Sequence, residues 1–273
     1  MSAVWRMTGR ALARGFAGLV ALLIGVTLFE IVQAPVVDAI GGPQGLDAIL
    51  DRIPPALQAF TRTRPEFMAV SGVAGYLSLG FTHPLYLTLC ISAIVGFAAR
   101  SLAGEMERGT VQLALARPIS RTQLYLSRTI GVVAISVALA AVGPLGLIVG
   151  YRWAQPVGQF SAAHLVPMAV GSLALFLAVG GLALLGSAAV SSAGRVLGWG
   201  LAIFVLMYVV DYFAAIWNFL EPIEFLSLFD YYDPTTSLVL GSVTPRHLLV
   251  LGLVGLAGWV GGLLVFANRD LPT

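Results

Sequence analysis

The sequence contains no lysine, only one cysteine and few charged residues. Charged side chains make up 10% of the 273 residues, whereas a soluble domain usually carries about 25%. The chain therefore lacks the polar surface that a water-soluble protein needs, and its 58% content of hydrophobic residues is typical of a polytopic membrane protein. The net charge of +2 is too small to indicate a nucleic-acid partner.

These absences exclude several kinds of site. Without lysine the chain has no intact Walker A loop, in which a lysine contacts the phosphates, so ATP-driven work would need a second chain that binds the nucleotide. The lone Cys90 lies in an apolar run and can form no intrachain disulfide, so we expect a buried thiol. The three histidines are far apart, and no H-E-x-x-H, Cys-x-x-Cys or G-x-S-x-G pattern supports a catalytic site.

Apolar stretches long enough to cross a bilayer, which takes about 20 residues, occur six times. They cover approximately residues 16–37, 76–99, 124–151, 165–190, 196–217 and 247–267. The first stretch is longer than the apolar part of a signal peptide and is followed by no clear cleavage site, so we expect it to span. The fourth and fifth are joined by a tight turn, and the alternative is that they merge or that one is re-entrant. The predicted fold class is an all-α polytopic membrane protein with one transmembrane domain.

Arginine placement predicts the orientation of these spans. With the N-terminus inside, the inner segments hold twice as many arginines as the outer segments. This bias satisfies the positive-inside rule. Both termini and the segment 100–120 are therefore expected in the cytoplasm, while the segments 38–75 and 218–246 are expected outside.

The two outer segments are themselves patterned. Apolar residues between 46 and 60 recur at helical spacing, which predicts a helix in the outer interface. The two prolines Pro54-Pro55 would kink or break this helix. Residues 217–234 contain six aromatic residues and are too interrupted for a full span. Because aromatic side chains favour the headgroup region, short interfacial or re-entrant helices are expected there, before the sixth span.

Carboxylates supply the candidate ligands for an ion. Within the spans, Glu30 and Asp211 are functional candidates because ionisable residues are rare in membranes. Each lies near the outer end of its span, so we expect both to extend to the interface. The last outer segment gathers four carboxylates that could form an outward cation site, although acidic loop residues are more often simply solvated. They are Glu221, Glu224, Asp230 and Asp233.

Small residues in the spans predict close contacts between helices. Gly258 and Gly262 have the required spacing in the sixth span. In the fourth span the small residues are Gly180-Gly181, Gly186 and Ser187. Such patterns are common in helix bundles, so they indicate close packing and do not by themselves indicate a dimer.

A charged, amphipathic island separates the second and third spans. Glu105 and Glu107 fall near the start of a short predicted helix, where the helix dipole favours negative charge. Pro118 ends that helix, and Ser120 is a candidate N-cap for a third span that opens at Arg121. This pattern alone fits equally a hairpin that returns the chain along the membrane surface and a helix that docks another protein.

The island resembles the signature of ABC-2 type transporter permeases. In that family the segment between the second and third spans carries an acidic pair, Gly-Thr, a leucine run and Pro-x-Ser-Arg. The matching residues are Glu105, Glu107, Gly109, Thr110, Leu113, Leu115, Arg117, Pro118, Ser120 and Arg121. The leucine run is diluted here to Leu-Ala-Leu-Ala, a departure that could weaken packing against a partner. Six spans, a basic N-terminal segment and a broken aromatic segment before the last span also fit the family plan.

The resemblance implies a transmembrane subunit that works as a dimer, with a second permease copy and two separate ABC ATPase subunits. ATP and Mg would bind the ATPase, and this chain would bind no cofactor. Residues 100–120 would form the coupling helix, with Arg108 among its contacts to the ATPase. Residues 1–15 would be an amphipathic elbow whose arginines face the phosphates of membrane lipid. The function implied is export of a cargo across a bacterial or archaeal plasma membrane. Apolar spans with aromatic outer edges would suit a lipophilic or amphipathic cargo, although the same features suit lipid contact in any membrane protein.

Other classes of protein stay open at this point. A secondary transporter or channel without an ATPase would need charges at the bilayer midplane or internal repeats with broken helices. The sequence has almost no charge at the predicted midplane and no convincing repeat between its two halves. A membrane anchor or assembly factor would pass ATPase motion to an outer partner, for which the outer segments are short. An intramembrane enzyme would need a catalytic set. The sequence identifies neither the cargo nor whether two identical permeases pair.

Overall fold

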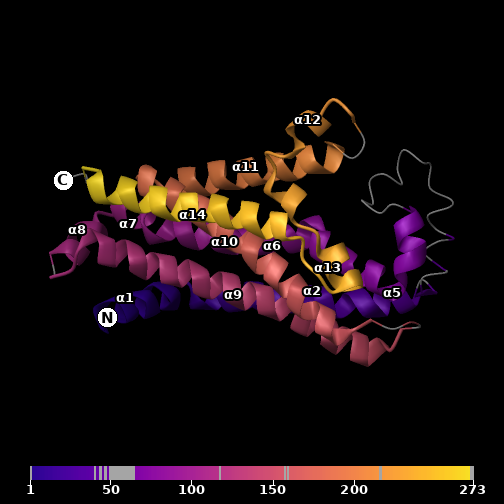
Figure 1. Cartoon of the computed structure of the whole chain (residues 1–273). Helices are drawn as coiled ribbons and strands as arrows, with labels where there is room; N and C mark the ends of the chain where they lie inside the picture. Colours follow the sequence, from indigo (N-terminus) through magenta and orange to yellow (C-terminus); the bar gives the residue numbers. More distant parts are fainter. Residues whose placement is uncertain are drawn as a thin grey trace.

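The protein is a bundle of helices in the computed structural model. The structure describes residues 2–39, 41, 42, 45, 48, 65–116, 118–156, 158, 160–214 and 217–270. Throughout these residues the regular structure is helical and contains no strand. Figure 1 shows an elongated bundle with both chain termini at the same end, which we call the terminal end. The predicted class, an all-α polytopic membrane protein, is confirmed.

Six helical segments are long and apolar enough to cross a membrane. They are α2 (Phe16–Ala39), α6 (Pro84–Ser101) continued by α7 (Ala103–Glu107), α9 (Arg121–Ala154), α10 (Leu165–Ala189) preceded by the 3-10 turn η2 (Ala162–His164), α11 (Ala193–Ala214) and α14 (Pro245–Asn268). A short N-terminal helix, α1 (Ser2–Ala13), precedes them. Because three residues separate the end of α10 from the start of α11, the fourth and fifth spans are separate helices and the merged alternative is wrong.

The spans differ in how deeply they lie in the bundle. The buried share of the apolar stretch is 72% in α6 with α7, 56% in α10 and 50% in α9. It is only 22% in α2 and in α14, and 17% in α11. The exposed side chains of the outer helices include large apolar residues such as Trp199 and Leu253. A helix that is apolar on every face and exposed on one suits contact with lipid. The core is thus α6, α9 and α10.

The glycines predicted to allow close packing do so between α10 and α14. A Cβ atom placed on Gly258 would lie 2.5 Å from the carbonyl carbon of Gly181 and 2.7 Å from the backbone nitrogen of Leu182. A Cβ atom on Gly262 would lie 3.1 Å from the Cα atom of Leu185. The two helices therefore meet backbone to backbone, and a larger residue at position 258 would separate them.

A helix break divides the predicted second span, 76–99. Helix α5 (Pro65–Thr82) ends before His83, and α6 begins at Pro84. Proline lacks an N–H group and disfavours a helical residue before it, so it suits the first position of a new helix. His83 caps that helix, its Nδ1 atom accepting a hydrogen bond from Leu85 N at 3.2 Å. The predicted interfacial helix at 46–60 lies outside the described residues, apart from Ala48.

The broken segment before the last span folds into short helices that enter the bundle, as predicted. They are α12 (Glu221–Glu224), the 3-10 turn η3 (Leu228–Tyr231) and α13 (Pro234–Leu240). The buried hydroxyl of Tyr232 lies 3.1 Å from Ser172 Oγ of α10 and donates to Phe81 O of α5 at 3.4 Å. Burial raises the pKa of Tyr232 well above its ordinary value. These contacts fix the segment at the end of the bundle opposite the termini (Figure 1).

Candidate functional site

The charged island folds as two short helices at the terminal end of the bundle (Figure 1), where the sequence predicted one. Helix α7 extends the second span, and α8 (Thr110–Leu115) follows it. Gly109 between them has a φ of 66°, a left-handed conformation that glycine adopts without steric cost. The hydroxyl of Thr110 donates to Glu105 O at 3.2 Å and closes the corner. The Gly-Thr pair therefore creates the bend between α7 and α8.

Glu105 faces the interior and joins α7 to two other helices. Its carboxylate accepts hydrogen bonds from Arg128 Nη2 of α9 at 2.9 and 3.0 Å, and both side chains are only 6% exposed. Arg14, which follows α1, donates to the same carboxylate at 3.0 Å. Arg128 also donates to Met7 O of α1 at 3.3 Å. Glu105 thus braces α7 against α1 and α9.

Glu107 is exposed but also makes a contact within the chain. Its carboxylate accepts a hydrogen bond from the backbone N–H of Ala193 at 3.0 Å and from Ser192 Oγ at 3.2 Å. Ala193 is the first residue of α11, so Glu107 caps the N-terminus of that helix, where negative charge is favoured. The acidic pair therefore holds α7 from two sides.

A serine and an arginine that sequence reasoning did not assign to this site complete the bracing. Ser187 of α10 donates to Ala98 O at 2.6 Å and accepts from Ala103 N at 3.0 Å, which satisfies backbone groups where α6 meets α7. Arg269 donates to Ala188 O at the end of α10 at 2.9 Å. Sequence reasoning placed Ser187 only in close helix packing, and nothing in the local pattern signals its distant partners.

The corner that follows α8 is fixed in the same way. Ser120 Oγ accepts from Gln123 N at 3.1 Å, and Gln123 Oε1 accepts from Ser120 N at 3.0 Å, so the predicted N-cap of the third span is confirmed as a capping box. Arg121 donates to Ala267 O at 3.1 Å and to Arg269 O at 2.6 Å. Its positive charge thus lies at the C-terminal end of α14, where a cation is favoured.

Among the remaining residues predicted to contact a partner, Leu113 is the exposed apolar side chain. Leu113 of α8 is 72% exposed, whereas Leu115 is half-buried against the core. Arg108, Gly109 and Pro118 are also exposed. Arg117 lies outside the described residues. The surface that α8 presents at the terminal end is therefore an exposed leucine beside charged and small residues.

Two hollows flank α7 and α8. One, of about 520 Å³, lies between α1 and α8 and is lined by residues that include Arg6, Arg10 and Leu113. The other, of about 410 Å³, lies between the junction of α1 with α2 and the end of α6. Its lining includes Arg14, Arg100 and Arg108. Both hollows are rich in arginine, so they suit negatively charged groups.

Comparison with known families decides the assignment. Residues 56–271, more than half of the chain, match the family described as ABC-2 family transporter protein. The chain belongs to the ABC-2 family of transporter proteins. The resemblance found in the island is thereby confirmed, and the matched residues include all of α7 and α8. No match was found among curated proteins. An ABC-2 chain with six apolar helices is a multi-pass membrane component of a transporter.

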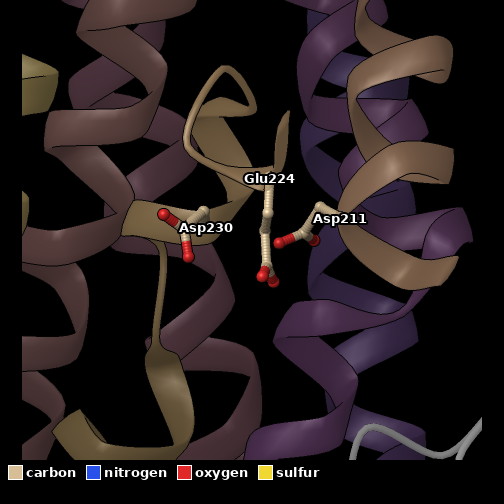
Figure 2. Close-up of side chains that lie close together, drawn as sticks. All are labelled: Asp211, Glu224 and Asp230. Atoms are coloured by element: carbon tan, nitrogen blue, oxygen red, sulfur yellow. The ribbon is translucent and has the colours of Figure 1, made fainter. Parts of the chain in front are cut away.

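The ABC-2 chain also holds an acidic cluster away from the terminal end. Figure 2 shows Glu224 of α12 between Asp211 of α11 and Asp230 of η3, and their carboxylate oxygens lie within 4.8 Å of one another. Oxygen ligands of this kind suit a hard cation such as Ca²⁺. Acidic groups are also common without an ion, so the cluster alone identifies none.

Only part of the predicted outward cation site takes part in this cluster. Glu224 and Asp230 belong to it, whereas Glu221 is exposed outside it and Asp233 caps α13 by accepting from Thr236 N at 2.8 Å. Asp211 is buried, so its predicted extension to the interface is wrong. Its side chain lies beside Glu224 of α12 and Asp230 of η3, inside the protein (Figure 2).

Glu30 of the ABC-2 chain is fully buried in the bundle. Its Oε2 atom would lie 2.8 Å from a Cβ atom on Gly80 of α5, and its Cβ atom would lie 3.1 Å from one on Gly146 of α9. Within the described part of the chain neither carboxylate oxygen has a hydrogen-bond partner. The predicted extension to the interface is therefore wrong here too, because α5 covers this face of α2.

Proposed function

We propose that this ABC-2 protein is the permease subunit of an ATP-driven exporter, and that α7 and α8 dock on a separate ATPase subunit. The observation that carries the proposal is the exposed Leu113 on a short helix whose base is fixed by charged contacts. A leucine that is 72% exposed, at an end of the bundle rich in charge, is costly to leave in water. A partner that covered it would recover that free energy.

The contacts around α7 would carry movement of the docked helix into the membrane. Glu105 links α7 to α1 and α9, and Glu107 links it to α11. Arg121, beyond α8, holds the end of α14. Since paired charges and capping bonds resist separation, a push on α8 would displace several spans together and would not merely bend a loop.

The hollow between α1 and α8 supplies the chemistry that a partner would meet. Arg6 and Arg10 are exposed along one side, and Leu113 and Pro118 line the other. An amphipathic segment of the ATPase with acidic residues facing α1 and apolar residues facing α8 would match both sides. The ATPase would bind ATP and Mg, and a second permease copy would complete the transporter.

This assignment also orients the protein. The terminal end would face the cytoplasm of a bacterial or archaeal cell, where ATP is available, with α12 and α13 toward the outside of the plasma membrane. The cargo would be a molecule of lipophilic character that enters from the bilayer, which apolar spans with aromatic outer edges would suit.

The test is a pull-down of the full chain, in mild detergent, with the ABC ATPase encoded beside its gene. Wild type should retain the ATPase, and Leu113→Asp should lose it. Leu240→Asp is the matched control, since Leu240 is also an exposed leucine (62%) but ends α13, at the opposite end of the bundle. Glu107→Arg is a poorer test because it would also remove the cap of α11.

Retention of the ATPase by Leu113→Asp at the wild-type level would refute the docking site. If wild type itself retained no ATPase, the permease assignment would fail in favour of a transporter or channel that works without one.

A further inference from the structure

The smaller hollow at the terminal end is a basic groove. It has a volume of about 410 Å³ and lies between the turn that joins α1 to α2 and the end of α6 with α7 and α8. Three guanidinium groups, those of Arg14, Arg100 and Arg108, line it. One carboxylate, that of Glu105, faces them. We call this hollow the arginine groove.

The positive charge of the arginine groove is not balanced within the chain. Arg14 bonds to Glu105, but that carboxylate is already shared with Arg128. The side chains of Arg100 and Arg108 are exposed, and neither guanidinium group makes a hydrogen bond or ion pair with any residue that the structure describes. Two guanidinium groups are therefore available to an external anion.

Glycines shape the walls on which these side chains lie. Arg100 Nη1 lies 3.2 Å from where a Cβ atom of Gly96 would be, and Arg100 Nη2 lies 3.9 Å from that of Gly15. Arg108 Nη1 lies 3.2 Å from the corresponding position at Gly104. Because no side chain occupies these positions, each guanidinium group can lie close to the backbone in the wall of the groove.

The residues around the groove suit the headgroup region of a bilayer. Arg100 is in the last turn of α6 and is the only charged residue of that apolar helix. The neighbouring helices α1 and α2 carry two exposed aromatic residues, Trp5 and Phe16, of the kind that gather at the membrane–water boundary. Phe97, one turn before Arg100 in α6, adds an apolar wall to the groove. A ligand here would thus combine an anionic head with an apolar tail.

We propose that the arginine groove binds the phosphate group of an anionic phospholipid in the leaflet at the terminal end. Guanidinium groups donate paired hydrogen bonds to phosphate oxygens, and arginine is the residue best suited to this recognition. Basic pockets between transmembrane helices bind lipid headgroups in this way. The lipid would tie α1 to α6 and α7, and it does so without any ATPase, so the proposal is independent of the proposed function.

The experiment is native mass spectrometry of the purified full chain in mild detergent, titrated with phosphatidylglycerol. Phosphatidylcholine with the same acyl chains and inorganic phosphate are titrated separately. Wild type should bind phosphatidylglycerol more tightly than phosphatidylcholine. Arg100→Gln should weaken phosphatidylglycerol binding about fivefold, and Arg100→Gln with Arg108→Gln about 25-fold.

Arg195→Gln is the matched control, because Arg195 is an exposed arginine at the terminal end of α11 but does not line the groove. It should leave lipid binding unchanged. Arg100→Lys keeps the charge and loses the paired donors. It should bind phosphatidylglycerol more tightly than Arg100→Gln does, which would show that substitution at this position leaves the fold intact.

Three results would overturn the proposal. The first is an equal loss of binding in Arg195→Gln and Arg100→Gln, which would indicate general attraction to charge. The second is phosphate binding as tight as lipid binding and lost in Arg100→Gln, which would make a soluble anion the ligand. The third is an absence of bound lipid together with a weakened ATPase pull-down in Arg100→Gln, which would make the groove part of a protein interface.

Discussion

Replacing Glu105 by glutamine should lower the free energy of unfolding by about 3 kcal/mol. The substitution removes the only carboxylate that pairs with Arg128 in the described part of the chain. Arg128, 6% exposed, would keep a 3.3 Å hydrogen bond to Met7 O, while its Nε atom already lacks a partner there. Removing one member of a buried ion pair costs about 3–5 kcal/mol. The lower value applies because the hollow beside Arg128, of about 520 Å³, can admit water.

The measurement is unfolding of the purified chain by sodium dodecyl sulfate, followed by tryptophan fluorescence. Arg14→Gln is the control: its side chain is 64% exposed, so its bond to the same carboxylate should contribute at most about 1 kcal/mol. The double variant Glu105→Met with Arg128→Met should recover most of the loss, because it leaves no unpaired charge in the interior. A cost below about 1 kcal/mol for Glu105→Gln, or an equal cost for Arg14→Gln, would refute the reasoning.

Two further predictions concern other parts of the bundle. Burial raises the pKa of Tyr232, so its protonated hydroxyl should stabilise the fold fully below about pH 10, the ordinary pKa of tyrosine. Stability should fall as the pH rises above that value. Tyr232→Phe should make this fall smaller in thermal unfolding measured between about pH 8 and 11. Gly258→Leu should force α14 away from Gly181 and cost at least about 1–3 kcal/mol. Gly252→Leu, at a position of α14 where an added Cβ atom would meet no other atom within 4 Å, should cost almost nothing in the same unfolding measurement.

The features that the sequence predicted depend on length, composition and local order. Six apolar stretches give six helices because a bilayer requires about 20 apolar residues for each span. Ser120 could be recognised because its capping partner, Gln123, lies three residues away. The spacing of small residues predicted that the fourth and sixth spans pack closely against other helices, but it did not predict that α10 and α14 are each other's partner.

The features that the sequence did not predict depend on which way a side chain points. A membrane helix is apolar on every face, so periodicity does not separate its buried side from its lipid side. Glu30 and Asp211 were expected at the interface because each lies near the outer end of its span, and no pattern in the sequence signalled that both are buried. Arg128 offered a usable signal, since an arginine in the first turns of an apolar span needs a partner. That this partner is Glu105 became visible only with α7 and α9 in place.

The backbone contact between α10 and α14 limits how this transporter can move. Two helices separated by a layer of side chains can slide, because the side chains change rotamers as they pass. Gly181 and Gly258 leave no such layer between them. We therefore expect the two helices to move as a rigid pair, so that any relative movement within the bundle takes place between other helices. We expect such movement at the contacts of α11, since α11 has the smallest buried share among the six apolar helices.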